Sequence, residues 1–278
     1  MTSPIRVTVW GENFHERAER DKAAMAERYP DGMHGAIAAG LTEVLGDSVT
    51  ITRATQDQPE NGLDEGVLAA TDVLTWWGHA THAGVDDAVV DRVHQRVLGG
   101  MGLLVLHSAH FSKIFRRLMG TTCSLAWRNS GDTELVWTVN PSHPITAGIP
   151  QPIVITEHEM YGEFFDIPAP DELIFLSTFS GGEVFRSGCC WRRGKGKVFY
   201  FSPGDQAYPI YHHPDIKRVL ANAVLWANPE RSTDFAPPAV ADMPDPSALG
   251  TQEQRCRRRA HALKFAVLLP ARVDVEVG

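Results

Sequence analysis

Histidines are the side chains of this sequence that most clearly point to chemistry. The chain has twelve of them, and more than half follow predicted strands or lie in loops expected on one side of the protein. Neutral imidazole is the commonest metal ligand and the usual proton-transfer group near neutral pH, so this clustering favours a site over separate structural histidines. No His-Glu-x-x-His or Cys-x-x-Cys motif is present. These histidines are His79, His82, His107, His110, His158, His212 and His213.

The stretch Gly102–Leu106 is the centre of this pattern. Its unbroken apolar side chains predict a strand covered on both faces of a parallel sheet. The following turn carries His107, Ser108 and His110 and leads into a helix at Lys113. Ligands of such sheets bind beyond the carboxyl ends of the strands. The turn resembles the elbow that holds the nucleophile of hydrolases and amidotransferases, but here imidazoles replace a cysteine or a Gly-x-Ser-x-Gly serine.

Acidic side chains supply the complement to these histidines. Glu157, Glu159 and Tyr161 fall in a segment, expected to be a loop, that also contains His158. In an extended backbone, alternate residues point the same way. A carboxylate placed there can complete a metal site or act as a proton-transfer base. A solvated acidic loop is the alternative interpretation.

The elements that must position these residues change character along the chain. In the first half strands and helices alternate, which predicts an α/β fold: a flavodoxin-like, doubly wound, mostly parallel sheet with helices on both faces. After Met119 short strands predominate, so the C-terminal half is expected to be β-rich before a last helix over 215–227. Earlier strands are expected at 5–10, 49–53, 72–77 and 102–106, and helices at 32–45, 64–70, 85–98 and 113–119.

Composition narrows the class of protein. The net charge of −8 disfavours nucleic acid as a partner, and no apolar run is long enough to span a membrane. A first strand that starts at Ile5 leaves no room for a signal peptide, and four cysteines do not form a disulfide framework, so we expect a cytoplasmic protein. We expect an α/β domain over 1–230, a Pro-rich linker over 231–250 and a poorly ordered basic and apolar tail over 251–278.

A set of ordered motifs between Ile5 and Pro229 resembles the trehalose-utilisation, or ThuA-like, family. That family belongs to the class I glutamine amidotransferase-like superfamily, so the resemblance implies the same flavodoxin-like fold. It also implies a role in disaccharide catabolism, on keto-sugar intermediates made by a partner sugar dehydrogenase. The motifs are Trp76–His79, Leu106–Ser108, His110–Lys113, Glu159–Glu163, Gly182–Gly188 and Tyr211–Asp215.

From the residues and this resemblance together we expect an enzyme that acts on a keto-disaccharide or a related keto-sugar. A ketone makes the neighbouring C–H acidic, so a carboxylate or imidazole can move that proton while a metal or imidazole holds the enolate; isomerisation and lyase or hydrolase chemistry both follow from this intermediate. The expected catalytic residues are Glu159, His107, His110 and Tyr161. The expected substrate-binding residues are Trp77, Ser108, Lys113 and Asn13, and the expected ligands of a divalent metal, zinc first, are His79, His107 and His213.

Two other functions stay open at this point. One is a non-catalytic sugar-binding or regulatory protein on a degenerate amidotransferase scaffold, because a fold does not determine a function. The other is a hydrolase that uses Ser108 with His213. Homo-oligomer formation is also open, whereas a small-molecule sugar is the expected partner in each case.

Overall fold

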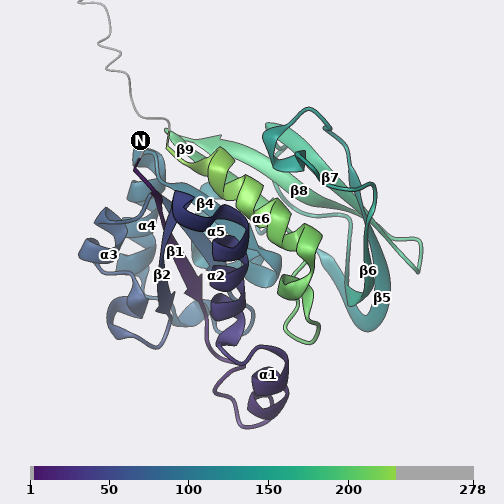
Figure 1. Cartoon of the computed structure of the whole chain (residues 1–278), viewed down its shortest axis with the longest axis horizontal. Coiled ribbons are helices and arrows are strands. Elements are labelled where there is room, and N and C mark those ends of the chain that lie inside the picture. The colour runs from purple at the N-terminus through teal and green to yellow at the C-terminus, as the bar shows by residue number, and fades with distance from the viewer. Residues whose placement is uncertain (1–2, 230–278) are drawn as a thin grey trace, which may run out of the picture. The chain divides into compact units, whose positions relative to one another are not determined.

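The computed structural model describes residues 3–229, so the linker expected at 231–250 and the tail expected at 251–278 lie outside the described residues. Nine strands form one mixed sheet in the order β2-β1-β3-β4-β9-β8-β7-β5-β6 (Figure 1). The first five strands of this order are parallel, and the other pairings are antiparallel. The order β2-β1-β3-β4-β9 has the form of a flavodoxin-like sheet.

The parallel half has the expected alternation of strands and helices. β3 and β4 are buried along their whole length, as their continuous apolar sequences predict. The short helix α1, which directly precedes α2, was not expected. The strands are β1 (Ile5–Gly11), β2 (Val49–Thr55), β3 (Val73–Trp77), β4 (Gly102–Leu106) and β9 (Gly196–Phe201). The helices are α1 (Lys22–Arg28), α2 (Gly32–Leu45), α3 (Glu65–Ala69), α4 (Asp87–Gly99), α5 (Lys113–Met119) and α6 (Pro214–Ala227).

The antiparallel half corrects one expectation. The acidic segment does not begin as a loop at Glu157, because β6 continues through Gly162 and pairs with β5. Glu159 and Tyr161 are therefore held on a strand, and their side chains are buried. The remaining strands are β5 (Ala126–Thr138), β6 (Ile153–Gly162), β7 (Glu172–Phe179) and β8 (Val184–Arg193).

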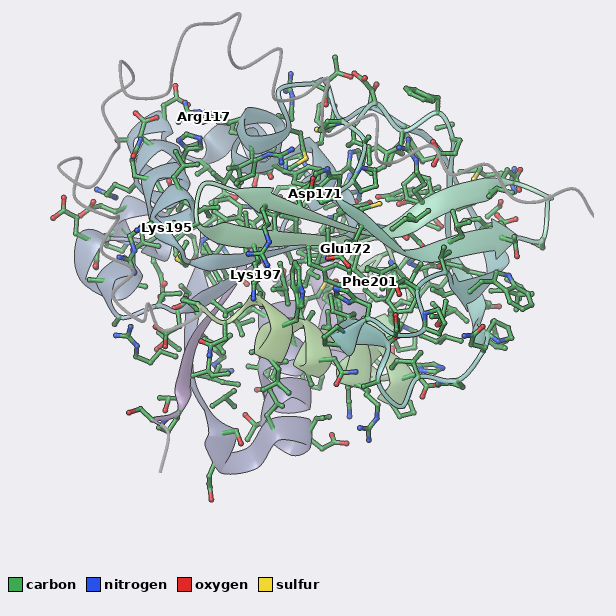
Figure 2. All side chains as sticks on the ribbon, turned by 90° about the horizontal axis from the view of Figure 1, so that it is seen from above. Arg117, Asp171, Glu172, Lys195, Lys197 and Phe201 are labelled. Atoms are coloured by element: carbon green, nitrogen blue, oxygen red, sulfur yellow. The ribbon has the colours of Figure 1, made fainter. Side chains whose placement is uncertain are left out.

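Helices cover both faces of the sheet and divide the core into two layers. Buried residues of α2 and α6 pack on one face, and buried residues of α3, α4 and α5 pack on the other. In Figure 2, Arg117 of α5 lies on one side of the sheet and α6 on the other, while Phe201 of β9 belongs to the core layer under α6. No helix within residues 3–229 has the length and apolar character that crossing a membrane requires.

Candidate functional site

His107 begins the turn at the carboxyl end of β4. Its backbone has a φ of 52°, a left-handed conformation that residues other than glycine rarely adopt. Strain of this kind persists only where the surroundings fix it, and it is concentrated at functional sites. A short 3-10 helix (His107–Phe111) follows, and Ser112 then caps α5 by accepting the backbone N–H of Phe115. The sharp elbow is therefore present, with an imidazole at the position of a nucleophile.

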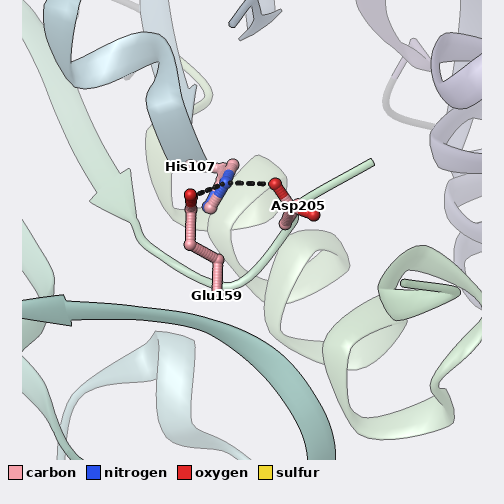
Figure 3. A group of neighbouring side chains, drawn as sticks. All are labelled: His107, Glu159 and Asp205. Carbon is pink, nitrogen blue, oxygen red and sulfur yellow. Dashed lines mark ion pairs between the residues drawn. The ribbon is translucent and has the colours of Figure 1, made fainter. Parts of the chain in front are cut away.

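Two buried carboxylates flank the His107 ring (Figure 3). Nε2 lies 3.1 Å from Glu159 Oε2 and 3.4 Å from Asp205 Oδ2. On the other edge of the ring, Nδ1 donates to the carbonyl oxygen of Ser202, at 2.7 Å. Because that carbonyl can only accept, the bond fixes which nitrogen carries the permanent proton. Nε2 is therefore the nitrogen that gains or loses a proton, and it faces both carboxylates in either state.

The two carboxylates change the protonation of this histidine. Complete burial by itself would lower the pKa of His107, but hydrogen bonds and charge interactions with Asp205 and Glu159 outweigh it and raise that pKa to about 10. Burial likewise favours neutral Asp205, yet its interactions with His107 lower the pKa of Asp205 to about 2. Without a metal, the group is therefore an imidazolium between two acidic side chains at neutral pH.

Tyr161 covers one face of the His107 ring. The two rings are parallel, with their centroids 4.8 Å apart, and the phenol oxygen lies 3.2 Å from Nε2. The same oxygen lies 2.8 Å from Ser108 Oγ. Burial raises the pKa of the Tyr161 hydroxyl well above its usual value. Tyr161 and Ser108 thus form a pair of neutral hydroxyl groups beside the acids.

The turn that carries Asp205 is held from two sides. His158 Nε2 accepts the backbone N–H groups of Gly204 and Asp205, at 3.0 and 3.2 Å, and its Nδ1 lies 2.7 Å from Glu134 Oε2. Trp77 Nε1 donates to the carbonyl oxygen of Gly204, at 2.9 Å. Trp77, expected to bind substrate, is fully buried and supports this turn.

A cavity of about 290 Å³ opens in front of Glu159 and the hydroxyl pair. His107 and Asp205 do not line it and have no exposed surface, so they lie behind Glu159. A molecule in the cavity therefore contacts Glu159 directly and His107 only through its neighbours. The lining residues are His79, His82, Ser108, His110, Phe111, Ser124, Leu125, Trp127, Glu159 and Tyr161.

His110 lines the same cavity as a neutral ring. Its Nδ1 donates to the carbonyl oxygen of Cys123, at 2.6 Å, which leaves Nε2 as an acceptor. Burial, with smaller contributions from His107, His82 and His79, lowers the pKa of His110 to about 3. This histidine can accept a hydrogen bond from a hydroxyl group, but it stays uncharged across the physiological range.

Three other expected site residues have different positions. Lys113 Nζ donates to Val85 O and Asp87 Oδ1, beside the start of α4. Asn13 donates to Asp57, at 3.0 Å, and lines a separate cavity. His213 caps α6, where its Nδ1 accepts the backbone N–H of Asp215. Since Ser108 Oγ bonds with Tyr161 instead, these contacts do not include the Ser108–His213 pair that a serine hydrolase requires.

Potential metal ligands converge on a different set from the one expected. Among residues 3–229, the group whose ligand atoms lie within 4.8 Å of one another is His107, Glu159 and Asp205. It shares only His107 with the expected set of His79, His107 and His213. Asp205 was missed because β9 lies beside β4 in the sheet although four other strands separate them in sequence. The sequence did contain one signal for Asp205: it follows a buried apolar strand, where ligands of parallel sheets bind.

Comparisons with known proteins identify the family. The sequence profile of ThuA, described as trehalose utilisation, matches residues 6–227. This chain belongs to the ThuA family. The strand order β2-β1-β3-β4-β9 agrees with the flavodoxin-like fold that the resemblance to this family implied. No functionally curated protein matches the chain.

Solved structures share this ThuA-type fold at low sequence identity. A ThuA-like protein from Bacteroides uniformis is 16% identical with a TM-score of 0.57, over 82% of this chain and 93% of that one. A cytoplasmic protein from Salmonella typhimurium is 13% identical with a TM-score of 0.56, over 81% of this chain and 100% of that one. A second ThuA-like protein, from Parabacteroides merdae, is 12% identical with a TM-score of 0.56, over 81% and 90% of the two chains. Identities this low establish the fold alone.

Proposed function

We propose that this ThuA-family chain is a sugar-catabolic enzyme that moves a proton on a keto-disaccharide or a related keto-sugar. One observation carries the proposal: the Glu159 carboxylate lines the cavity while His107, behind it, lies 3.1 Å away. A carboxylate held by a buried imidazole and placed against a small cavity is well suited to proton transfer. Family membership supports the sugar substrate, because the family is described as trehalose utilisation.

Glu159 is the proposed base. The C–H bond beside a ketone is acidic because the resulting enolate spreads its charge onto oxygen. Glu159 takes this proton and loses its negative charge. The His107 imidazolium, 3.1 Å away, holds the carboxylate in place before and after the transfer. Return of the proton to the former carbonyl carbon, with a proton passing between the two oxygens of the enediol, gives an isomeric keto-sugar. Departure of a glycosidic group from the carbon next to the deprotonated one gives elimination. His107 and Asp205 are positioning residues in this scheme, since neither lines the cavity.

Three other polar side chains complete the proposed chemistry. The hydroxyls of Tyr161 and Ser108 bond to each other beside Glu159, which leaves one O–H of the pair to stabilise negative charge on the ketone oxygen. His110, locked as a neutral acceptor, suits a sugar hydroxyl. Trp127 and Phe111 also line the cavity and are 67% and 44% exposed. The exposed part of the Trp127 ring can stack on a sugar, whereas Arg116 lies over the Phe111 ring.

A divalent metal such as zinc fits the same residues. His107 Nε2, Glu159 and Asp205 supply three donors, with Nε2 lying 3.1 and 3.4 Å from the two carboxylates. Apart from this ion-pair contact with His107, the buried Asp205 Oδ2 has no hydrogen-bond partner among the described residues. The bond from Nδ1 to Ser202 O orients the ring as second-shell contacts of metal-bound histidines do. When bound, such an ion would act as a Lewis acid toward oxygen.

The substrate chemistry also sets the proposed context. A keto-disaccharide forms by oxidation of a sugar hydroxyl, so a sugar dehydrogenase is the proposed functional partner, and both proteins would work in the cytoplasm.

Solvent exchange tests the reaction directly. Keto-trehalose incubated with the protein in D₂O should acquire deuterium at the carbon beside the carbonyl, as followed by NMR. Tight binding of keto-trehalose without exchange or turnover would instead favour the sugar-binding alternative.

A further inference from the structure

A partly buried chain of hydrogen bonds leads to the cavity through His79. His15 Nδ1 lies 2.8 Å from Asp21 Oδ2, and His15 Nε2 lies 2.9 Å from His79 Nδ1. His15 is 3% exposed and makes edge contacts with the aromatic rings of Phe14 and Trp77. His79, the last member, lines the cavity. This contact joins residues 64 positions apart, so the sequence gives no local signal for it.

The direction of the chain follows from the chemistry of its ends. The Asp21 carboxylate accepts hydrogen bonds from His15 and from Arg20 Nε, and these interactions outweigh burial and lower its pKa. Asp21 is therefore ionised and can only accept, so His15 Nδ1 carries a proton. A His15 ring that carries this one proton accepts at its other nitrogen, Nε2, so its partner His79 Nδ1 must donate. His79 consequently presents an unprotonated Nε2 on its opposite edge.

Glu12 fixes the backbone of the same histidine. Its carboxylate, 3% exposed, accepts the N–H of His79 at 2.6 Å and that of Ala80 at 2.9 Å. The loop after β3 is thus anchored through its main chain, while His15 orients the ring. Burial is also the largest of the effects that lower the pKa of His79, which agrees with a neutral ring.

We propose that Asp21 and His15 are positioning residues that lock His79 in the tautomer whose Nε2 accepts a hydrogen bond from a hydroxyl of the bound sugar. This inference rests on the proposed function, because it names a sugar as the occupant of the cavity. His110 is locked in the same tautomer by Cys123. The cavity therefore holds two fixed acceptors, His79 and His110, together with the hydroxyl pair Ser108–Tyr161. Such an arrangement selects a ligand with several hydroxyl groups.

The test measures the tautomer directly, without relying on activity. Long-range ¹H–¹⁵N NMR of the full chain should show His79 protonated at Nδ1 in the wild type. His15→Phe removes the acceptor, and Asp21→Ala releases His15 to adopt either tautomer; both should move the His79 proton toward Nε2. Asp21 makes no side-chain cap for α1, so its loss should leave that helix intact. Arg20→Ala is the matched control, because it leaves the Asp21–His15 bond in place.

Affinity for trehalose, a non-reacting disaccharide, tests the sugar contact. Calorimetry should show roughly three- to tenfold weaker binding to His15→Phe and Asp21→Ala, as expected for loss of one hydrogen bond, with no change for Arg20→Ala. An unchanged His79 tautomer in both variants would overturn the positioning role. A changed tautomer with unchanged affinity, or no binding of trehalose to the wild type, would overturn the sugar contact. Absence of deuterium exchange into keto-trehalose would reject the proposed reaction while leaving the tautomer result standing.

Discussion

His107 Nε2 lies 3.1 Å from Glu159 Oε2 in a part of the protein where both side chains are almost completely buried. Asp205 Oδ2 lies 3.4 Å from the same nitrogen, so one imidazole pairs with two carboxylates. Removing one partner from a buried ionic group leaves the others uncompensated. The stability of the fold and the state of the site therefore depend on the same ring.

This relationship predicts a pH-dependent loss of stability in His107→Asn. The folded-state pKa of His107 is raised from about 6.5 to about 10, so protonated His107 contributes fully below about pH 6.5 and its contribution is lost as the pH rises through 10. Urea unfolding with a chelator present should show a deficit of roughly 3–5 kcal/mol at pH 6 that shrinks toward pH 10. A deficit that grows with pH would contradict the imidazolium assignment.

Metal binding should follow the convergent residues rather than the histidines expected from the sequence. Excess zinc should raise the Tm of the wild type, since a ligand bound only by the folded state stabilises it. Asp205→Asn should lose this shift, and metal analysis should find correspondingly less bound ion. His213→Ala should keep the shift despite a modest loss of stability from its missing helix cap. The opposite pattern, with His213 required and Asp205 dispensable, would restore the original ligand set.

The rim of the cavity should set affinity rather than rate. Trp127 is 67% exposed and lies opposite Tyr161 on the paired strands β5 and β6, so their side chains share one face of the sheet. Trp127→Ala should raise KM for keto-trehalose by roughly three- to tenfold with little change in kcat. Phe164→Ala is the matched control, because Phe164 is 75% exposed but does not line the cavity. Equal effects of the two substitutions would remove Trp127 from the site.

The parallel half of the fold was predictable because its sequence is locally consistent. Gly102–Leu106 is apolar throughout and is buried on both faces, and the helix expected over 32–45 has the observed bounds. The part of β6 from Glu157 onward was expected to be a loop, because Glu157, His158 and Glu159 are three polar residues in a row. Polar side chains at buried strand positions break the ordinary pattern, and functional sites are where such breaks are expected.

The site was only partly predictable, because several of its contacts are long-range. The elbow histidines and Glu159 follow from strand ends and alternation, which depend on neighbouring residues. Asp205 and His15 join the site only when distant strands and loops meet, and no spacing in the sequence encodes that meeting. Trp77 illustrates the converse: an aromatic residue at a strand end is as well suited to supporting a turn as to binding a sugar.

Deuterium exchange by Glu159→Gln tests the central claim most directly. The amide keeps the size of the side chain and much of its hydrogen bonding but cannot take a proton, so the variant should fold and bind trehalose. Glu157→Gln, on the same strand but exposed, is the matched control. Exchange into keto-trehalose in D₂O should fall roughly 10²–10⁴-fold in Glu159→Gln and stay at the wild-type rate in Glu157→Gln. Exchange at the wild-type rate in Glu159→Gln would contradict the account.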